Sequence, residues 1–304
     1  MMTWLMRLLY ALLWLGGLLP LRVLHALGSG IGEIAWMLKG RERRITEINL
    51  ALIETHDSAL AGHLDARQVL RETGKSAIEV AKVWSGRPQQ ALRLVREVRG
   101  AEIFEQALES GKGVIIAAPH LGCWELLSYW LAERTPLAIV YRPPRNADVE
   151  PLLIKARGAT KVEQVRAEGA GVRNLYRRLS AGGVVGILPD QQPRKGDGEF
   201  APFFGIEALT MVLVPRLAER TGATVLFAFA ERLPRGAGFR IHVQAAPPRI
   251  ADTDLRAACT ALNEGVEACV RIAPMQYQWH YKRYSINPPG PKRRLYASVP
   301  ESSV

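Results

Sequence analysis

The chain has 304 residues, 48% of them apolar, with a formal net charge of +11 and an isoelectric point near 9.9. This length and composition suffice for a full hydrophobic core, and no Ser-, Gly- or Pro-rich linker divides the middle of the chain. The three cysteines form no CxxC pair, which argues against a disulfide framework and a zinc site and fits a reducing compartment. The positive charge predicts an anionic partner, and charge alone leaves nucleic acid, acidic lipid and an acidic carrier protein open.

The N-terminal forty residues are strongly apolar. Residues 8–21 carry no charge, the apolar character continues to Leu38, and a basic run follows at positions 39–44. A basic run beside an apolar segment is typical of the cytoplasmic side of a membrane. We therefore expect residues 1–40 to form a hydrophobic membrane anchor, a helix embedded in or crossing the bilayer. A cleaved signal peptide and a buried core helix are the alternatives, and no A-x-A-like cleavage site follows the apolar run.

The body of the chain, residues 41–290, alternates helical and strand patterns. Apolar residues at three- and four-residue spacing predict helices at 41–52, 66–84, 101–109, 126–134, 149–157, 171–179, 209–220 and 254–272. Short apolar runs predict strands at 114–119, 137–141, 184–188 and 224–229, and residues 239–244 should pair back on the last of these as a hairpin. Alternation of this kind predicts an α/β fold with a mostly parallel central sheet flanked by helices. Residues 291–304 read as a basic, flexible tail.

One histidine stands where parallel sheets usually bind ligands. His120 follows the predicted strand at 114–119, and Glu125 would lie on the first turn of the next helix. A carboxylate five residues on can reach one ring nitrogen, fix the tautomer and leave the other nitrogen as a general base. A structural histidine that caps the helix is the alternative, because the spacing alone is a weak signal.

Four sequence blocks have distinctive motifs. PHLGCWE at 119–125 has the form His-x4-acid, and YRPPRN at 141–146 begins with Tyr-Arg-Pro. PDQQPRKGDGEFAPFFG at 189–205 begins with an Asp-Gln block and ends in Phe-Phe-Gly, and PMQYQWHYKRY at 274–284 contains Gln-Tyr-x-Trp. These four blocks resemble those of the lipid A biosynthesis late acyltransferases, which belong to the glycerolipid acyltransferase superfamily. Their order matches over nearly the whole chain.

The resemblance implies an acyltransferase fold and a metal-free, cofactor-free reaction. His120 and Glu125 would be catalytic, with His120 taking a proton from a lipid hydroxyl and backbone amides near Gly122 supporting the oxyanion. Arg142, Asp190, Gln191 and Gly205 would bind substrate. The donor would be acyl carrier protein, the acceptor a glycolipid in an anionic membrane, and the location the cytoplasmic side of the inner membrane of a Gram-negative bacterium. Nucleic acid is not expected as a partner.

Two other functions stay open at this point. A lysophospholipid acyltransferase shares the His-x4-acid motif but has no need of the Asp-Gln block or of the C-terminal segment. A basic, membrane-anchored binding protein without catalytic activity would explain the charge, and it predicts that His120→Ala leaves function intact. The sequence contains no GxxxxGK[ST], G-x-S-x-G or HExxH motif, which argues against a P-loop enzyme, a serine hydrolase and a zincin.

Overall fold

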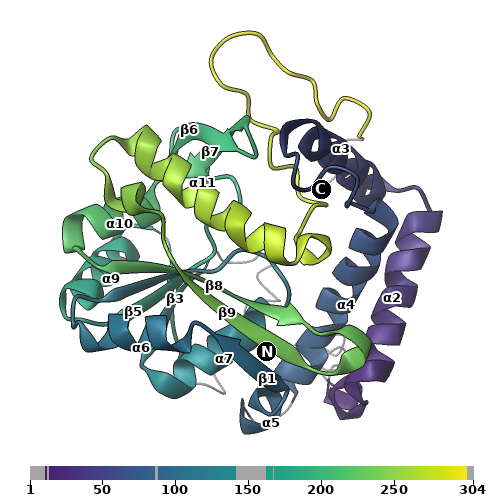
Figure 1. Cartoon of the computed structure of the whole chain (residues 1–304), viewed down its shortest axis with the longest axis horizontal. Coiled ribbons are helices and arrows are strands. Elements are labelled where there is room, and N and C mark those ends of the chain that lie inside the picture. The colour runs from purple at the N-terminus through teal and green to yellow at the C-terminus, as the bar shows by residue number, and fades with distance from the viewer. Residues whose placement is uncertain (1–10, 12–13, 86–87, 142–161, 167, 300–304) are drawn as a thin grey trace.

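A seven-stranded sheet forms the centre of the computed structural model, which describes residues 11, 14–85, 88–141, 162–166 and 168–299 (Figure 1). The strand order is β1-β9-β8-β2-β5-β3-β4. The strand bounds are β1 Val95–Arg99, β2 Val114–Ala117, β3 Leu137–Tyr141, β4 Val162–Arg166, β5 Val184–Ile187, β8 Thr224–Arg232 and β9 Phe239–Ala245. The five strands from β8 to β4 run parallel, whereas β9 pairs antiparallel with β8 and β1 lies parallel to β9. The predicted α/β class and mostly parallel sheet are therefore confirmed.

Helices cover both faces of the sheet because the side chains of each buried strand alternate between two cores. Ile115 and Ala117 of β2 face one core, to which α9 (Ala170–Ser180), α10 (Leu213–Thr221) and α11 (Leu255–Ile272) contribute. Val114 and Ile116 face the other core, which α6 (Ala101–Glu109) and α7 (Trp124–Arg134) complete. Figure 1 shows α11 over one face and α6 and α7 over the other. Both faces of β2 are fully buried, as its unbroken apolar run predicts.

Three helices precede the sheet and lie beside its β1 end: α2 (Leu21–Met37), α3 (Arg41–His56) and α4 (Ala66–Trp84) (Figure 1). The short helix α5 (Pro88–Leu92) leads into β1. Helix α2 packs closely along α4, and this contact depends on glycine: a Cβ on Gly74 would lie 2.1 Å from the carbonyl oxygen of Gly28. Among the described residues, no helix combines the length and the apolarity that a membrane span requires.

The outward face of α2 is apolar and exposed. Its large side chains recur at helical spacing and are between 42% and 74% exposed: Val23, Leu27, Ile31, Ile34, Met37 and Leu38, the last just beyond the helix. The opposite face is tied to α4 by ion pairs, His25 with Glu79 and Glu33 with Arg67 and Arg71. The helix therefore has one face bound to the protein and one apolar face without cover from the described chain.

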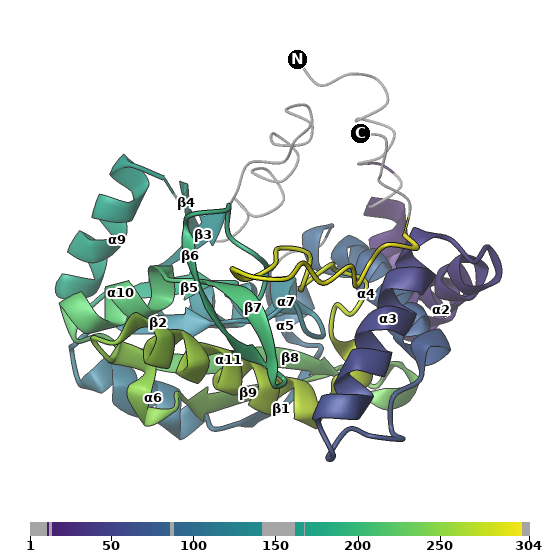
Figure 2. The same cartoon turned by 90° about the horizontal axis from the view of Figure 1, so that it is seen from above.

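The C-terminal segment, residues 273–299, runs between α3 and a β-hairpin (Figure 2). The hairpin consists of β6 (Gly198–Phe203) and β7 (Ile206–Met211). Asn49 of α3 donates to the carbonyl oxygens of Trp279 and Tyr281, and Arg293 donates to that of Glu207 on β7. The segment thereby joins the N-terminal helices to the sheet domain.

Most predicted helices and strands are confirmed. The errors lie where pairing between strands, rather than local spacing, sets the secondary structure. The helices predicted at 66–84 and 101–109 have these bounds in the structure. The helix predicted at 209–220 is wrong for its first residues, because 206–211 pair with 198–203 as the hairpin and α10 begins only at Leu213. Strands β1 and β4 were not predicted, and their half-exposed, charged sequences explain why. The helix predicted at 149–157 lies outside the described residues.

Candidate active site

His120 and Asp190 come together because they follow neighbouring parallel strands in the same register. Strands β2 and β5 pair residue 117 with residue 187, and each strand is followed three residues later by one of the two side chains. The sequences VIIAAPH and VVGILPD are thus two copies of one pattern, a buried strand, a proline and a polar side chain. The pair lies at the carboxyl edge of the sheet, where open α/β sheets bind ligands.

Asp190 makes two hydrogen bonds with His120. The backbone N–H of His120 donates to Oδ2 at 3.0 Å, and ring atom Nδ1 lies 2.9 Å from Oδ1. Burial raises the pKa of the Asp190 carboxyl, but the charge of His120 and these two hydrogen bonds outweigh burial and leave the pKa below its ordinary value. Since an ionised carboxylate only accepts, Nδ1 carries a proton and the lone pair of neutral His120 is on Nε2.

The Nε2 side of the ring faces a group of side chains from three segments. The Gln191 amide nitrogen lies 3.4 Å from Nε2 and donates to Oε1 of Gln278 at 3.1 Å. The Trp124 ring meets the imidazole edge-on, with 5.3 Å between the centroids. The His120 side chain is 16% exposed, so it is partly open to solvent. Gln278 belongs to the sequence block at 274–284, whose motif does not mark it as a site residue.

The carboxylate on Nδ1 of the imidazole is a different residue from the one expected. Glu125 lies on the first turn of α7, as predicted, and its side chain is buried. Its Oε2 accepts the indole N–H of Trp84 at 3.1 Å, whereas Nδ1 of His120 lies on Asp190 and Nε2 faces Gln191. Helix α7 places Glu125 beside α4, while the neighbouring strand brings Asp190 to Nδ1. Asp190 is therefore the carboxylate that contacts the ring, and the catalytic role expected of Glu125 stays a prediction.

The amides expected to support an oxyanion are already bonded to the protein. Gly122 N–H donates to the carbonyl oxygen of Gln276 at 3.2 Å, and Cys123 N–H donates to that of Ala230 at 2.9 Å. Gly122 has φ of +61°, and a Cβ there would lie 2.0 Å from the Ala230 oxygen. These contacts hold the loop against β8 and the C-terminal segment. The amides of Gly122 and Cys123 thus have a structural role.

Two further predicted site residues are Gly205 and Arg142. Gly205 forms the turn between β6 and β7 with φ of +73°, beside His56 of α3. Phe203 and Phe204, at the same turn, are buried against Tyr284 and Trp279, which makes them core residues. Arg142 lies outside the described residues.

The described residues contain neither an exposed cysteine nor a cluster of potential metal ligands. No group of three or more His, Cys, Asp or Glu side chains there has a metal-binding arrangement. The three thiols are buried, and burial raises the pKa of Cys259 and of Cys269 to about 12. Thiols that stay protonated at neutral pH are poor nucleophiles.

The sequence matches known proteins over nearly the whole chain. The sequence model of a family described as bacterial lipid A biosynthesis acyltransferase matches residues 1–285. The chain belongs to this family. A lipid A biosynthesis lauroyltransferase of Escherichia coli (strain K12) is 26% identical over 291 residues, which cover 94% of this chain and 93% of that protein. A lipid A biosynthesis palmitoleoyltransferase of the same organism is 27% identical over 281 residues, 91% of this chain and 90% of the relative.

A further relative is a phosphatidylinositol mannoside acyltransferase of Mycobacterium tuberculosis (strain CDC 1551 / Oshkosh). It is 27% identical over 168 residues, 50% of this chain and 49% of that protein. Membership of the lipid A acyltransferase family makes this chain an acyltransferase. An imidazole paired with a buried carboxylate, as His120 is with Asp190, is an arrangement that can serve as a general base.

Proposed function

We propose that the protein transfers a fatty acyl chain from the thioester of acyl carrier protein to a hydroxyl of the acylated glucosamine disaccharide precursor of lipid A. The observation that carries the proposal is the His120–Asp190 pair at the carboxyl edge of the sheet. A histidine with a carboxylate on Nδ1 is arranged to take a proton at Nε2.

The reaction has two steps at one base. Nε2 of His120 removes the proton from the acceptor hydroxyl as its oxygen attacks the thioester carbonyl carbon. The tetrahedral intermediate then expels the carrier thiolate, which receives the proton from the imidazolium. Asp190 stabilises the imidazolium between these steps. Arg142 holds an anionic group of a substrate, as its sequence block suggests.

Glu125 stays in the proposal as the second acidic residue of the site. It follows Trp124, whose ring contacts His120, and the indole of Trp84 holds its carboxylate in place. Comparing Glu125→Gln with Asp190→Asn separates two possibilities. If Glu125→Gln abolishes acyl transfer while Asp190→Asn keeps the wild-type rate, Glu125 is the carboxylate that acts on the imidazole.

The membrane surface is the proposed place of the reaction, on the cytoplasmic side of the inner membrane of a Gram-negative bacterium. The exposed apolar face of α2 supports contact with lipid, because a row of side chains at helical spacing matches an interfacial helix. Basic residues follow α2 at Lys39, Arg41, Arg43 and Arg44, and such residues attract anionic head groups.

The donor is proposed as acyl carrier protein because its acidic surface complements a chain of net charge +11. Helix α9 presents exposed Arg173 and Arg177 at the end of the sheet opposite α2 (Figure 1). Such a face would speed the encounter with an acidic protein and make it sensitive to salt.

The test is acyl transfer by the purified protein in detergent, with acyl carrier protein thioester as donor. Two acceptors are supplied in parallel, the Kdo-bearing lipid A precursor and a lysophospholipid. We expect mass spectrometry to show one added acyl chain on the first acceptor, and His120→Ala to lower the rate by about 10²–10⁴-fold, as for loss of a general base. Acylation of the lysophospholipid alone would favour the glycerophospholipid alternative. An unchanged rate in His120→Ala would refute the mechanism.

A further inference from the structure

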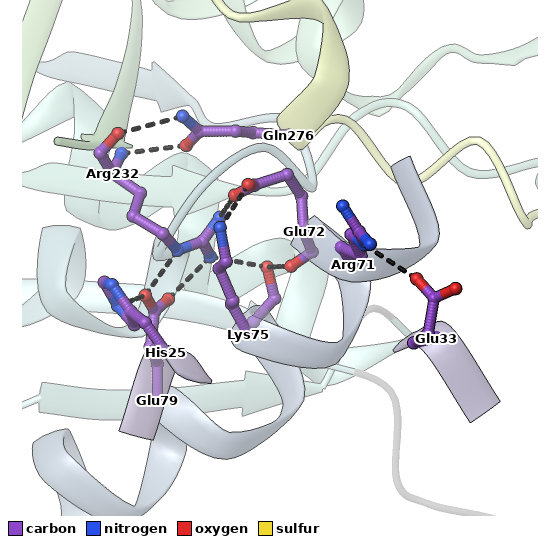
Figure 3. A network of polar contacts seen from close by, with 9 residues as sticks. His25, Glu33, Arg71, Glu72, Lys75, Glu79, Arg232 and Gln276 are labelled. Atoms are coloured by element: carbon purple, nitrogen blue, oxygen red, sulfur yellow. Dashed lines mark hydrogen bonds and ion pairs between the residues drawn. The ribbon is translucent and has the colours of Figure 1, made fainter. Parts of the chain in front are cut away.

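A cluster of buried charges lies next to the loop that carries His120 without taking part in the reaction (Figure 3). Its centre is Arg232, the last residue of β8, whose side chain is 2% exposed. The guanidinium donates to both carboxylate oxygens of Glu79, to Glu72 at 2.7 Å and to the hydroxyl of Ser76 at 2.8 Å. All three partners lie on α4, so the cluster fixes the end of β8 against this helix.

The cluster continues to α2. Glu79 is 1% exposed and also lies 2.6 Å from Nε2 of His25, which projects from the inner face of α2. Burial alone would lower the pKa of Arg232, but the charges and hydrogen bonds of Glu79 and Glu72 outweigh it and raise that pKa. The guanidinium therefore stays charged, and its fork holds several partners at fixed angles.

Gln276 connects this cluster to the loop between β2 and α7, residues 118–123. Its side-chain amide pairs with the backbone of Arg232 in both directions: Oε1 accepts the N–H at 2.8 Å, and Nε2 donates to the carbonyl oxygen at 3.0 Å. The backbone carbonyl of Gln276 accepts from Gly122, and two residues on, Gln278 N–H donates to the carbonyl oxygen of His120 at 3.2 Å. The loop is thus held between the end of β8 and residues 276–278.

Stability does not explain why this position is charged. Moving two carboxylates and a guanidinium out of water costs about as much free energy as their mutual attraction supplies. Apolar residues can often replace such groups without loss of stability. Orientation does explain it, because a bidentate guanidinium fixes direction as well as distance. A displacement of about 1 Å at a reacting group can lower a rate by roughly 10²-fold.

We propose that Arg232 and Gln276 are positioning residues for His120, which keep the imidazole on Asp190 by fixing the loop against β8 and α4. The inference rests on the proposed role of His120 as general base. Arg232 acts through Gln276, and neither residue touches substrate. Gln276 is the sharper target, because it bonds backbone groups and its loss leaves no buried charge without a partner.

The experiment compares Gln276→Met with Gln106→Met, a matched change at an exposed position of α6. Methionine keeps the length of the side chain and removes both hydrogen bonds to Arg232. We expect kcat to fall by about 10- to 100-fold, the KM for the acyl donor to change less than about twofold, and the unfolding temperature to fall only slightly below that of Gln106→Met, because two hydrogen bonds to the Arg232 backbone are lost. Hydrogen exchange of the peptide covering residues 119–124 should accelerate in Gln276→Met only.

A double-mutant cycle separates positioning from a general structural effect. In a His120→Ala background, Gln276→Met should lower the residual rate no further, because its effect passes through the imidazole. An equal loss in both backgrounds, or a kcat of Gln276→Met equal to that of Gln106→Met, would overturn the inference. A wild-type rate in His120→Ala would instead refute the proposed function.

Arg232→Lys gives a second measurement with the charge retained. A lysine can pair with Glu79 but cannot bridge Glu79, Glu72 and Ser76 together. We expect a kcat between those of wild type and Gln276→Met, with faster exchange in the same peptide. If kcat and hydrogen exchange in Arg232→Lys equal those of wild type, the planar guanidinium is not needed. That result would contradict the role of Arg232.

Discussion

Replacing Asp190 with asparagine tests the pairing that distinguishes this site from the one expected from sequence. The change preserves shape and removes the charge beside Nδ1 of His120, which lies 2.9 Å from Oδ1. An amide group facing Nδ1 would also favour the tautomer whose lone pair points at that new amide rather than at the acceptor hydroxyl. Both effects lower the rate without altering the fold.

The magnitude follows from the geometry. Charge centres about 4 Å apart interact by about 4 kcal/mol at an effective dielectric constant of about 20. Since about 1.4 kcal/mol corresponds to a factor of ten in rate, loss of this interaction in the transition state lowers kcat roughly 10³-fold. The wrong tautomer adds to the loss.

The assay is initial-rate acyl transfer at neutral pH, with Asp197→Asn as the control. Asp197 lies on an exposed turn seven residues further on, so the control makes the same chemical change away from His120. We expect a normal rate in the control and a rate at least about 10²-fold lower in Asp190→Asn, with unchanged secondary structure by circular dichroism. A rate within about threefold of wild type in Asp190→Asn would refute the role of Asp190.

Three further predictions concern stability and membrane contact. Gly74→Ala should lower the free energy of unfolding by about 1–3 kcal/mol in a urea titration, because its Cβ would meet the Gly28 oxygen, whereas Gly30→Ala, with open space around it, should not. Burial lowers the pKa of His280 from 6.5 to about 4, so the unfolded chain binds a proton that the folded chain does not. Wild type should therefore lose about 3 kcal/mol more than His280→Gln between pH 6.5 and 4, and equal losses would contradict the burial. Ile31→Glu should weaken binding to anionic vesicles in a flotation assay, while Ile272→Glu, similarly exposed on α11, should leave it unchanged; equal binding by both would exclude α2 as the contact.

Local pattern alone determined much of this protein. The apolar residues of 66–84 and 101–109 recur at helical spacing, which is a local property of the sequence. The Asp65 side chain also caps the first of these helices. Local sequence therefore predicts the bounds of both helices. The unbroken apolar run of β2 likewise predicts a strand buried on both faces, with His120 at its carboxyl end. The family blocks then indicated acyl transfer.

Tertiary structure decided which groups meet. The local spacing of His120 and Glu125 suggested one pair, but the parallel register of β2 and β5 brings Asp190 to the ring from a distant part of the chain. The strand-proline-polar pattern occurs twice in the sequence. It predicts that the two polar side chains meet only once the two strands are known to be neighbours. The contacts of Arg232 with α4 and of Gln276 with the His120 loop depend equally on packing between distant segments. Hydrophobic periodicity depends only on residues that are close in the sequence. Strand order and register depend instead on burying all faces of the sheet at once.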